Sequence, residues 1–242
     1  MTAKRESRPI QAIQELVIRG SADVVVKRGE PSMTVIADRP EDVITEIRGG
    51  VLTISQKPTM AMGRGVMVGV GDGSIQIGSV QGNVTINGGW GAAQVFYGSV
   101  GNVAGGDIVI NGDGQRARVE ITLPGLSEAS ISGAGNLCLE DLDQDAIELE
   151  ISGSGNATLT GCVKRLDAKI SGAGDVNAKK LEAESASLNV SGAGKIKALV
   201  KNSLKARVSG AGDIKVWGDA AQRDTRVSGV GDIRFKKAQA EA

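Results

Sequence analysis

Residues Ile170-Ser-Gly-Ala-Gly-Asp175 carry the motif that decides the fold of this 242-residue chain, because the motif recurs six times. Each copy has Ile or Val, then Ser-Gly-x-Gly, then Asn, Asp or, once, Lys. The copies lie at 131–136, 151–156, 170–175, 190–195, 208–213 and 227–232. Successive motif serines are 20, 19, 20, 18 and 19 residues apart. A near-constant period of this length is typical of a solenoid, in which each repeat packs against its neighbours.

The segments on both sides of each motif alternate between apolar and polar residues, which predicts half-buried strands. The two glycines between the strands permit a corner, through a positive φ or through close approach of the backbone to another chain segment. The apolar positions after the motifs hold Leu137 and Leu139, Ala157 and Leu159, Val176 and Ala178, Ile196 and Ala198, Ile214 and Val216, and Ile233 and Phe235.

Each repeat is therefore a strand, a glycine corner, a second strand and a less regular return. A coil of 19 residues at about 3.3 Å per residue has a perimeter of roughly 60 Å, which suits a thin tube. Coils stacked about 4.8 Å apart would pair each strand with its copies in the neighbouring coils. The predicted fold class is all-β, a parallel β-helix with coils of about 19 residues and a β-rich N-terminal cap.

Four segments are expected along the chain. Residues 1–58 form a β-rich N-terminal cap or first coils, residues 115–236 form the six-repeat solenoid, and 237–242 form a tail. Residues 59–114 hold 16 glycines and four charged residues, and form a Gly-rich insertion made of degenerate coils or a protrusion. The degenerate-coil interpretation rests on echoes such as Val84-Thr-Ile-Asn87, which returns as Ile108-Val-Ile-Asn111.

The composition excludes several kinds of chemistry. The chain has no histidine, so it has no Ser-His-Asp or Cys-His nucleophile system and no His-containing zinc or haem site. Lys plus Arg equals Asp plus Glu at 28 each, which argues against binding of polyanions by the whole chain. There are too few rings for a platform that stacks bases or sugars. The five aromatic residues are Trp90, Phe96, Tyr97, Trp217 and Phe235.

The position after each motif forms a row that permits two interpretations. A ladder of oxygen ligands would suit calcium, but short polar residues are also common in turns, and Lys195 interrupts the row. The Gly/Asp-rich segments 69–73 and 105–114 lack the nine-residue period of calcium-binding repeats. We therefore predict no metal, cofactor or catalytic site. The row consists of Asn136, Asn156, Asp175, Lys195, Asp213 and Asp232.

Charge is unevenly distributed along the solenoid. Residues 122–160 hold seven acids and no Lys or Arg, and a carboxylate pair there would suit glycoside hydrolysis. Residues 161–220 hold 11 basic and six acidic residues, which would suit a phosphate backbone. Opposite charge at the two ends would also favour self-association. We expect two basic stacks on different outer faces, Lys197 with Lys215 and Arg234, and Arg207 with Arg226.

Both ends of the chain and both cysteines bear on the compartment. Met1–Pro9 is polar and charged, which is unlike a secretory signal. No window approaches the 18 apolar residues of a membrane span. The chain as given is expected to be cytoplasmic, or exported if a signal has been removed. Cys138 is expected to point outward and Cys162 to pack in the core, without a bridge between them.

The repeated Ile/Val-Ser-Gly-Ala-Gly-Asp/Asn resembles the head GIN domain family, which is described as autotransporter adhesins. The segments Glu15-Leu-Val-Ile-Arg-Gly20, Val24-Val-Val-Lys-Arg-Gly29 and Gly49-Gly-Val-Leu-Thr-Ile54 fit the same family. The resemblance covers residues 12–58 and 115–236. It implies a β-helix-like fold and adhesion, and it brings no catalytic residues.

Together these observations predict a non-enzymatic β-solenoid that presents repetitive faces for protein–protein interaction or self-assembly. The expected partner is a protein or further copies of the chain. The first alternative is a carbohydrate-active enzyme or a polysaccharide binder on a β-helix scaffold. The second is a nucleic-acid binder that uses a basic face, which the composition disfavours.

Overall fold

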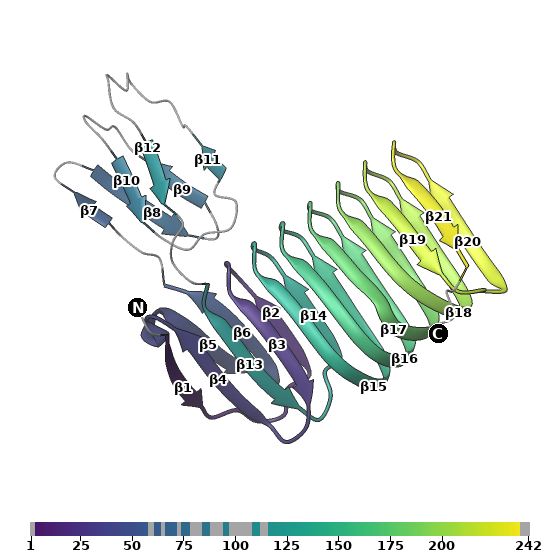
Figure 1. Ribbon diagram of the computed structural model, residues 1–242, viewed down its shortest axis with the longest axis horizontal. Coiled ribbons are helices and arrows are strands. Elements are labelled where there is room, and N and C mark those ends of the chain that lie inside the picture. Colours follow the sequence, from purple (N-terminus) through teal and green to yellow (C-terminus); the bar gives the residue numbers. More distant parts are fainter. Residues whose placement is uncertain are drawn as a thin grey trace.

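The computed structural model describes residues 3–57 and 116–237, together with the backbone of six short strands between them. The described residues form strands and one short 3-10 helix, η1 (Pro40–Asp42). A row of similar coils runs through the molecule toward the C-terminal end (Figure 1). The strands of these coils are β14 (Glu128–Ile131), β15 (Asn136–Ile151), β16 (Asn156–Ile170), β17 (Asp175–Val190), β18 (Lys195–Val208), β19 (Asp213–Trp217), β20 (Gln222–Val227) and β21 (Asp232–Lys236).

Strands of successive coils pair in parallel, and each motif lies over the motif before it. Ile151 pairs with Ile170, Ile170 with Val190 and Val190 with Val208. This register confirms the predicted parallel β-helix. The expected irregular return is extended instead, because β15 runs without interruption from the end of one corner to the start of the next. A positive φ of 55° at Asp141 marks the bend in that strand.

The alternating apolar residues form the core. Leu139, Leu159, Ala178, Ala198 and Val216 each have at most 1% of their surface exposed. They follow the motifs of five successive coils at the same spacing, and Leu139 pairs with Leu159, Ala178 with Ala198, and Ala198 with Val216. Burial of a Leu or Val side chain stabilises the fold by about 1.5–3 kcal/mol. A thin tube filled by Ala, Val, Leu and Ile thus explains how the chain folds with few rings.

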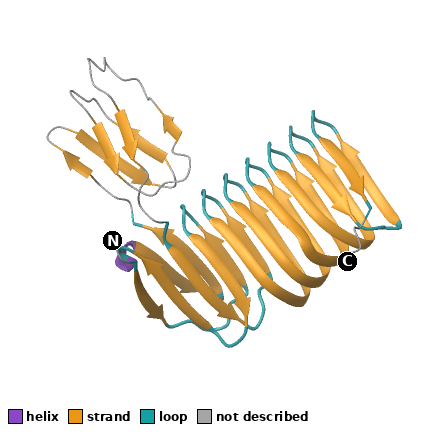
Figure 2. Cartoon of the chain, in the orientation of Figure 1, coloured by secondary structure: helices purple, strands orange, loops and turns teal. Residues whose placement is uncertain are grey.

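Close approach, and not a positive φ, explains the corner glycines. None of the motif glycines has a positive φ. A Cβ on Gly172 or Gly192 would overlap the carbonyl oxygen of the glycine one coil earlier. The backbone N–H of Ala173 donates to Gly153 O at 3.0 Å, and that of Ala193 to Gly172 O at 3.0 Å. The corners stack as a row of loops along one edge of the molecule (Figure 2).

The structure contains a seventh corner that the motif search missed. Strand β2 (Glu15–Ile18) pairs with β14, and β3 (Asp23–Arg28) pairs with β15. The segment Arg19-Gly20-Ser21-Ala22 between them lies under the first Ser-Gly-Ala-Gly corner, and Gly133 packs directly on Gly20. This segment lacks the Ser-Gly-x-Gly order, and its sequence signal is a glycine between two alternating strands.

The coils do not follow one another in chain order at the N-terminal end. Strand β6 (Val51–Gln56) pairs with β2, and β13 (Arg118–Leu123) pairs with β3. Strands β6 and β13 therefore form the terminal coil, and the earlier strands β2 and β3 lie between this coil and the first repeat. Three antiparallel strands extend the end further: β4 (Ser32–Ala37) beside β13, β1 (Lys4–Arg8) beside β4, and β5 (Val43–Arg48) beside β6. Residues 3–57 thus hold one coil, made of β2 and β3, one strand of the terminal coil, β6, and three strands that continue the sheet beyond it.

The Gly-rich segment leaves the solenoid at a corner position. Ile54 pairs with Ile18 and Arg118 pairs with Asp23, so the segment stands where other coils have a four-residue corner. Strand β10 (Val84–Asn87) pairs in parallel with β12 (Ile108–Asn111), in the register of the sequence echo. The sequence contains a second echo, Gly78-Ser-Val-Gln-Gly-Asn83 with Gly98-Ser-Val-Gly-Asn102, and these residues fall outside the described part of the chain. The other strands here are β7 (Ala61–Gly63), β8 (Val66–Gly71), β9 (Ser74–Ile77) and β11 (Gln94–Phe96).

Candidate functional site

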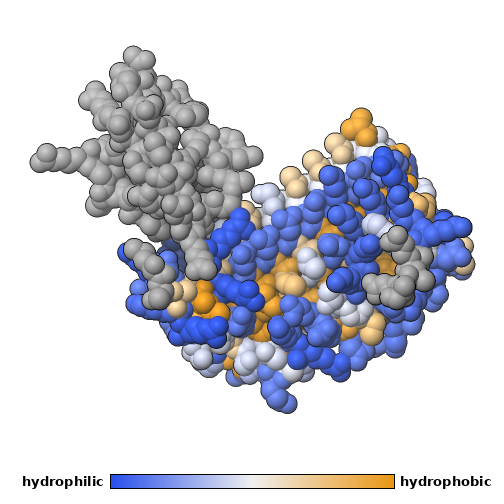
Figure 3. Space-filling view, in the orientation of Figure 1, coloured by the Kyte–Doolittle hydropathy of each residue, from blue (hydrophilic) through white to orange (hydrophobic). Residues whose placement is uncertain are grey.

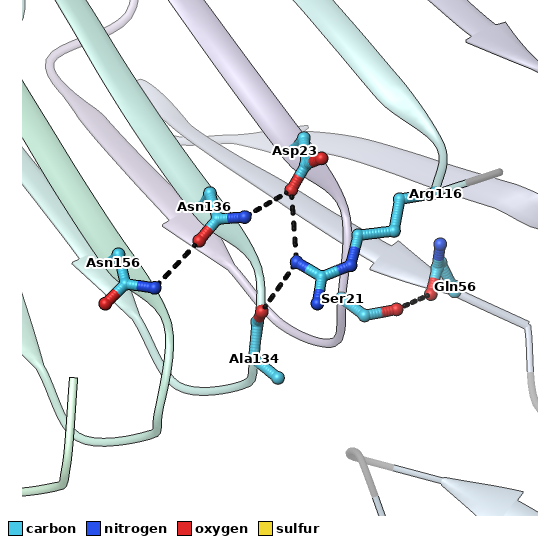
Figure 4. A network of polar contacts seen from close by, with 7 residues as sticks. All are labelled: Ser21, Asp23, Gln56, Arg116, Ala134, Asn136 and Asn156. Carbon is cyan, nitrogen blue, oxygen red and sulfur yellow. Dashed lines mark hydrogen bonds and ion pairs between the residues drawn. The ribbon is translucent and has the colours of Figure 1, made fainter. Parts of the chain in front are cut away.

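A ladder of short polar side chains runs along the exit side of the corners. Asn136 Nδ2 donates to Asp23 Oδ1 at 2.8 Å, and Asn156 Nδ2 donates to Asn136 Oδ1 at 3.2 Å (Figure 4). Further along, side-chain oxygens accept from backbone: Asp175 N–H donates to Asn156 Oδ1 at 3.1 Å, and Lys195 N–H to Asp175 Oδ1 at 2.9 Å. From Asp23 to Lys195 the row that could have been a calcium ladder is therefore linked by hydrogen bonds from coil to coil, and at its end Asp232 accepts from Arg234 Nε of its own strand at 2.8 Å. Among the described residues, no group of three or more His, Cys, Asp or Glu is arranged so that it could hold a metal ion.

The start of the ladder also anchors both ends of the Gly-rich segment. Ser21 is 3% exposed, and its hydroxyl donates to Gln56 Oε1 at 3.0 Å, just before the segment begins. Arg116 follows the segment, and its Nη1 lies 3.5 Å from both Asp23 Oδ1 and Ala134 O. Figure 4 shows these contacts converging on the first corner. The segments 69–73 and 105–114, considered above for calcium, lie outside the residues whose side chains are described.

The outer surface has two long faces that differ in their charged side chains. The entry face consists of the outward residues of the strands that lead into the corners. The exit face consists of the outward residues of the strands that follow the corners. The entry face comprises the outward positions of 15–17, 128–130, 148–150, 167–169, 187–189, 205–207 and 224–226. Parallel register places these segments one above the next.

The N-terminal half of the entry face carries a row of carboxylates. Glu128 pairs with Glu15 on one side and Glu148 on the other, and Glu148 pairs with Asp167. Partial burial, reinforced by the charges of Glu15, Glu148 and Glu150, raises the pKa of Glu128. Glu128, Glu148 and Asp167 also line a shallow groove that continues over the return segment. Stacking of like charges in this way is unfavourable for folding, so the row is a candidate for a functional surface.

The C-terminal half of the entry face is basic. Arg207 pairs in register with Arg226, as predicted, and both are exposed. They line a second groove with Lys169, Asn189 and the motif serines of three coils. On the exit face Lys197 pairs with Lys215, and Lys215 pairs with Arg234, which confirms the other predicted stack. The entry face thus changes from acidic to basic along the solenoid axis.

Several acids of residues 122–160 are neutralised by bases in neighbouring coils. Ion pairs join Glu140 to Lys27 at 3.0 Å, Asp145 to Lys164 at 2.7 Å and Glu150 to Lys169 at 2.9 Å. Asp143 is bound by Arg28, and this contact lowers its pKa. By contrast, Glu128, Glu148, Arg207 and Arg226 form no ion pair with any described residue. Within residues 122–160, the acids without an ion pair to any described residue are Glu128 and Glu148 on the entry face and Asp141 in the return segment.

The prediction for Cys162 is wrong. Cys162 is exposed, with its Sγ 3.7 Å from Asp143 Oδ1. Gly161, not Cys162, pairs with Leu142 and Leu181, because the register between coils shifts just before it. Gly161 has a φ of 117°, and a Cβ there would overlap the backbone of Leu142. Cys138 is partly exposed, and burial together with the Glu140 carboxylate raises the pKa of its thiol.

A family model described as "putative auto-transporter adhesin, head GIN domain" matches residues 13–220. The chain belongs to the head GIN domain family. The match includes the corner of β2 and β3 that the motif search missed, and it spans the Gly-rich segment. A search of curated proteins gives no match.

Two solved structures have a similar fold to this head GIN protein. A putative adhesin from Bacteroides fragilis superposes with a TM-score of 0.62 at 13% identity, covering 97% of each chain. A putative adhesin from Parabacteroides distasonis gives a TM-score of 0.51 at 18% identity, also covering 97% of each chain. At these identities the likeness concerns the fold. Within the described part of the head GIN chain, no helix has the length and apolar character needed to cross a membrane.

The geometry gives the two alternative functions little support. Glycoside hydrolysis needs a pair of carboxylates, and the row on the entry face contains several. The aromatic rings with described side chains, which could bind a sugar, lie elsewhere. Trp217 is on β19 beneath the Lys179 ammonium, and Phe235 is on β21 beneath the Arg223 guanidinium. Both rings lie in strands that leave the corners, away from the carboxylates. Of the basic stacks, that of Lys215 has the Trp217 ring two residues further along the same strand, and the Lys179 ammonium lies over this ring at 5.1 Å from its centroid.

Proposed function

We propose that this head GIN protein is a non-enzymatic binding protein whose entry face holds a protein partner, a second copy of the chain included. The observation that carries the proposal is the separation of charge on that face. Glu128 and Glu148 lie toward one end, Lys205 and Arg207 toward the other, and none has an ion-pair partner among the described residues. A rigid stack of coils holds these charges at fixed spacing, which favours a partner with the opposite order of charge.

The family description supports binding over catalysis, since it names adhesins. It also supports action outside the cell, as an alternative to the cytoplasmic location that the first residues predict. Unpaired surface charges act mainly on the rate of encounter and on the choice of partner. The complex should therefore weaken as salt rises, because the Debye length falls from about 10 Å at 0.1 M to about 3 Å at 1 M.

The test uses two variants that each make the entry face a single sign. The first carries Glu128→Lys with Glu148→Lys, and the second carries Lys205→Glu with Arg207→Glu. Each should lose most of the partner that the wild-type protein captures. If the partner is a second copy, each variant alone should lose the self-association made through the entry face, whereas a mixture of the two should regain it. Capture and self-association unchanged in both variants would refute the proposal.

A matched control changes the same amount of charge on the other face. Lys197→Glu with Lys215→Glu alters the exit face in the same coils, and it should leave capture unchanged. Loss of binding in this control as well would show that net charge, not the entry face, controls the interaction. Melting temperatures of all variants establish that the solenoid remains folded.

The Gly-rich segment 59–114 is proposed as an additional contact region. Replacing residues 55–117 by Ser-Gly-Ala-Gly would join β6 to β13 through a four-residue corner, the length found between Ile18 and Asp23. This variant should fold and keep the interactions of the entry face. A partner that is captured by the wild-type protein but not by the replacement variant would locate part of the interface in the segment.

A further inference from the structure

The two ends of the solenoid differ in whether further strands pair with the last coil. At the N-terminal end, the antiparallel strands β1, β4 and β5 extend beyond the terminal coil. At the C-terminal end, β20 pairs with β18 and β21 pairs with β19, and neither pairs with another described strand. The last coil is visible as the outermost pair of strands in Figure 1.

The last coil leaves apolar surface uncovered. Every residue of β20 is exposed, including Val227 at 45%, and Phe235 of β21 is 39% exposed. Val230, in the last corner, is 89% exposed. Hydrophobic surface is seen at the end of the row of corners (Figure 3). In each earlier coil, the side chains at the positions of Val227 are buried, as for Val190 and Val208.

The backbone of these edge strands is available for pairing. Ser228 N–H donates back to Val208 O at 2.9 Å. Backbone groups alternate in direction along a strand, so the N–H and C=O of Thr225 and Val227 point to the open side. An exposed edge of this kind is a template for another strand unless charges or cover prevent pairing.

The charges on the edge strands distinguish between possible partners. Each strand carries an acid and a base two residues apart on its outer side: Asp224 and Arg226 on β20, Asp232 and Arg234 on β21. A further coil stacked in parallel would again place base on base, as Arg207 lies on Arg226. Antiparallel pairing of β20 with its own copy, centred at Thr225, places each Asp224 opposite an Arg226 of the second copy. The same arrangement of β21 about Ile233 places Asp232 opposite Arg234.

We propose that two copies of this chain associate end to end through β20 and β21, related by a two-fold axis that crosses both strands. The contact is isologous and closes at a dimer. Extension into a filament is blocked because the opposite end bears antiparallel strands, of which β1 is charged (Lys4–Arg8). The proposal is distinct from the function proposed for the entry face, because it uses the open backbone edge of the last coil, where Asp224 and Arg226 are the last residues of that face.

One inward-directed charge fits this arrangement. Arg223 occupies the position of the buried Leu204, and its guanidinium lies 4.5 Å from the centroid of the Phe235 ring. It is held there by hydrogen bonds to Ala220 O at 2.8 Å and Asp219 Oδ1 at 3.3 Å. Inward charges of this kind hinder indiscriminate pairing of edges. Arg223 covers the ring in the single chain without occupying the open backbone of Thr225.

The first test measures the mass of the full chain in solution by sedimentation equilibrium over a range of concentrations. The wild-type protein should be in a monomer–dimer equilibrium with no larger species. Thr225→Pro removes a backbone N–H that faces the open side, and proline is accepted in edge strands when it breaks no ladder bond. This variant should be monomeric with an unchanged melting temperature at low concentration, and Thr225→Ala should dimerise like the wild type.

The second test uses the charge pattern. Asp224→Arg should weaken the dimer at least tenfold, because two arginines then face each other in each half of the contact. Combining Asp224→Arg with Arg226→Asp should restore it to within a few-fold. A wild-type protein that is monomeric at all concentrations, species larger than a dimer, or a dimer that survives Thr225→Pro would overturn the proposal. Equal loss in the single and double charge variants would overturn the antiparallel register.

Discussion

A methyl group on Gly172 would overlap the carbonyl oxygen of Gly153 in the preceding coil. The same relationship links Gly192 to Gly172, and Gly153 to Gly133. The corners therefore stack through bare backbone, and each glycine is required by the glycine one coil away.

Substitution of Gly172 by Ala should destabilise the protein by more than about 1 kcal/mol, since overpacking against backbone forces a shift of the coil. Gly172→Val should cost more. In a chain of this length 1 kcal/mol corresponds to a fall of about 2–4 °C in the melting temperature. Gly125→Ala is the matched control, because the new Cβ would lie 3.5 Å from Gln144 Oε1, at ordinary contact distance. Equal melting of the two variants would show that the corners can separate.

The ladder predicts a pH-dependent cost for Asn136→Asp. The new carboxylate would face Asp23 Oδ1, to which Asn136 Nδ2 now donates at 2.8 Å. We expect a loss of about 1–2 kcal/mol at neutral pH, since a charge-assisted hydrogen bond becomes a like-charge contact. The pKa of the carboxyl pair would be raised in the folded state, so the loss should shrink as the pH falls through that range. Asn136→Ala removes the same hydrogen bonds without a charge, and its cost should not depend on pH in this way.

The carboxylate row predicts that Glu128→Gln stabilises the protein at neutral pH. Burial and the neighbouring acids raise the pKa of Glu128 in the folded state above its ordinary value. The folded state therefore binds this proton more tightly than the unfolded state, and stability falls as the pH rises through the window between the two values. At pH 7 the variant should melt about 1–3 °C higher than the wild type.

The gain from Glu128→Gln should disappear at pH values below about 4, where the carboxyl is protonated in both states. Glu30→Gln changes an exposed glutamate in the turn before β4 and should leave melting unchanged at both pH values. Thermal unfolding monitored by circular dichroism at pH 3.5 and 7 measures the melting temperatures of the wild type and of both variants. A lower melting temperature of Glu128→Gln at pH 7 would contradict the assigned environment.

The two cysteines should differ in reactivity. Cys162 is exposed, whereas burial and Glu140 raise the pKa of the Cys138 thiol and so reduce its thiolate fraction. A thiol reagent at pH 8 should therefore label Cys162 several-fold faster. Cys162→Ser should remove the fast phase, and Cys138→Ser should remove the slow one. Faster labelling of Cys138 would show that the return segment is oriented differently.

The six Ser-Gly-x-Gly motifs predicted the fold class, the parallel register and the stacks of Lys197 on Lys215 and Arg207 on Arg226. These motifs predict only contacts between repeats that are adjacent in the sequence, because every repeat pairs with its sequence neighbour. The pairing of Asp23 with Asn136 joins segments far apart in the chain, and no periodicity marks it. The corner at Gly20 was missed because its serine and glycine are in another order.

The repeat pattern also could not predict the orientation of the Cys162 side chain. A register shift within the return segment places Gly161 over Leu142, and counting residues from the motif serine cannot detect it. The carboxylate row could be extended to Glu15 only after β2 was placed beside β14, since Glu15 belongs to a coil that the motif search did not find. The pattern thus located the repeated faces, and the structure added the non-repeated coils that complete them.

The position of β2 and β3 has a consequence for synthesis of the chain. These strands are synthesised before the repeats, but three of their four described partner strands lie beyond residue 117: β14 beside β2, and β13 and β15 beside β3. Most of their hydrogen-bonded pairs therefore form late. The repeats from β14 to β18 involve short loops, which close at lower entropic cost than distant pairings. We expect this block to fold first and to serve as the template on which the N-terminal strands assemble. Strands β2 and β3 are then synthesised before the repeats but complete their pairing after them.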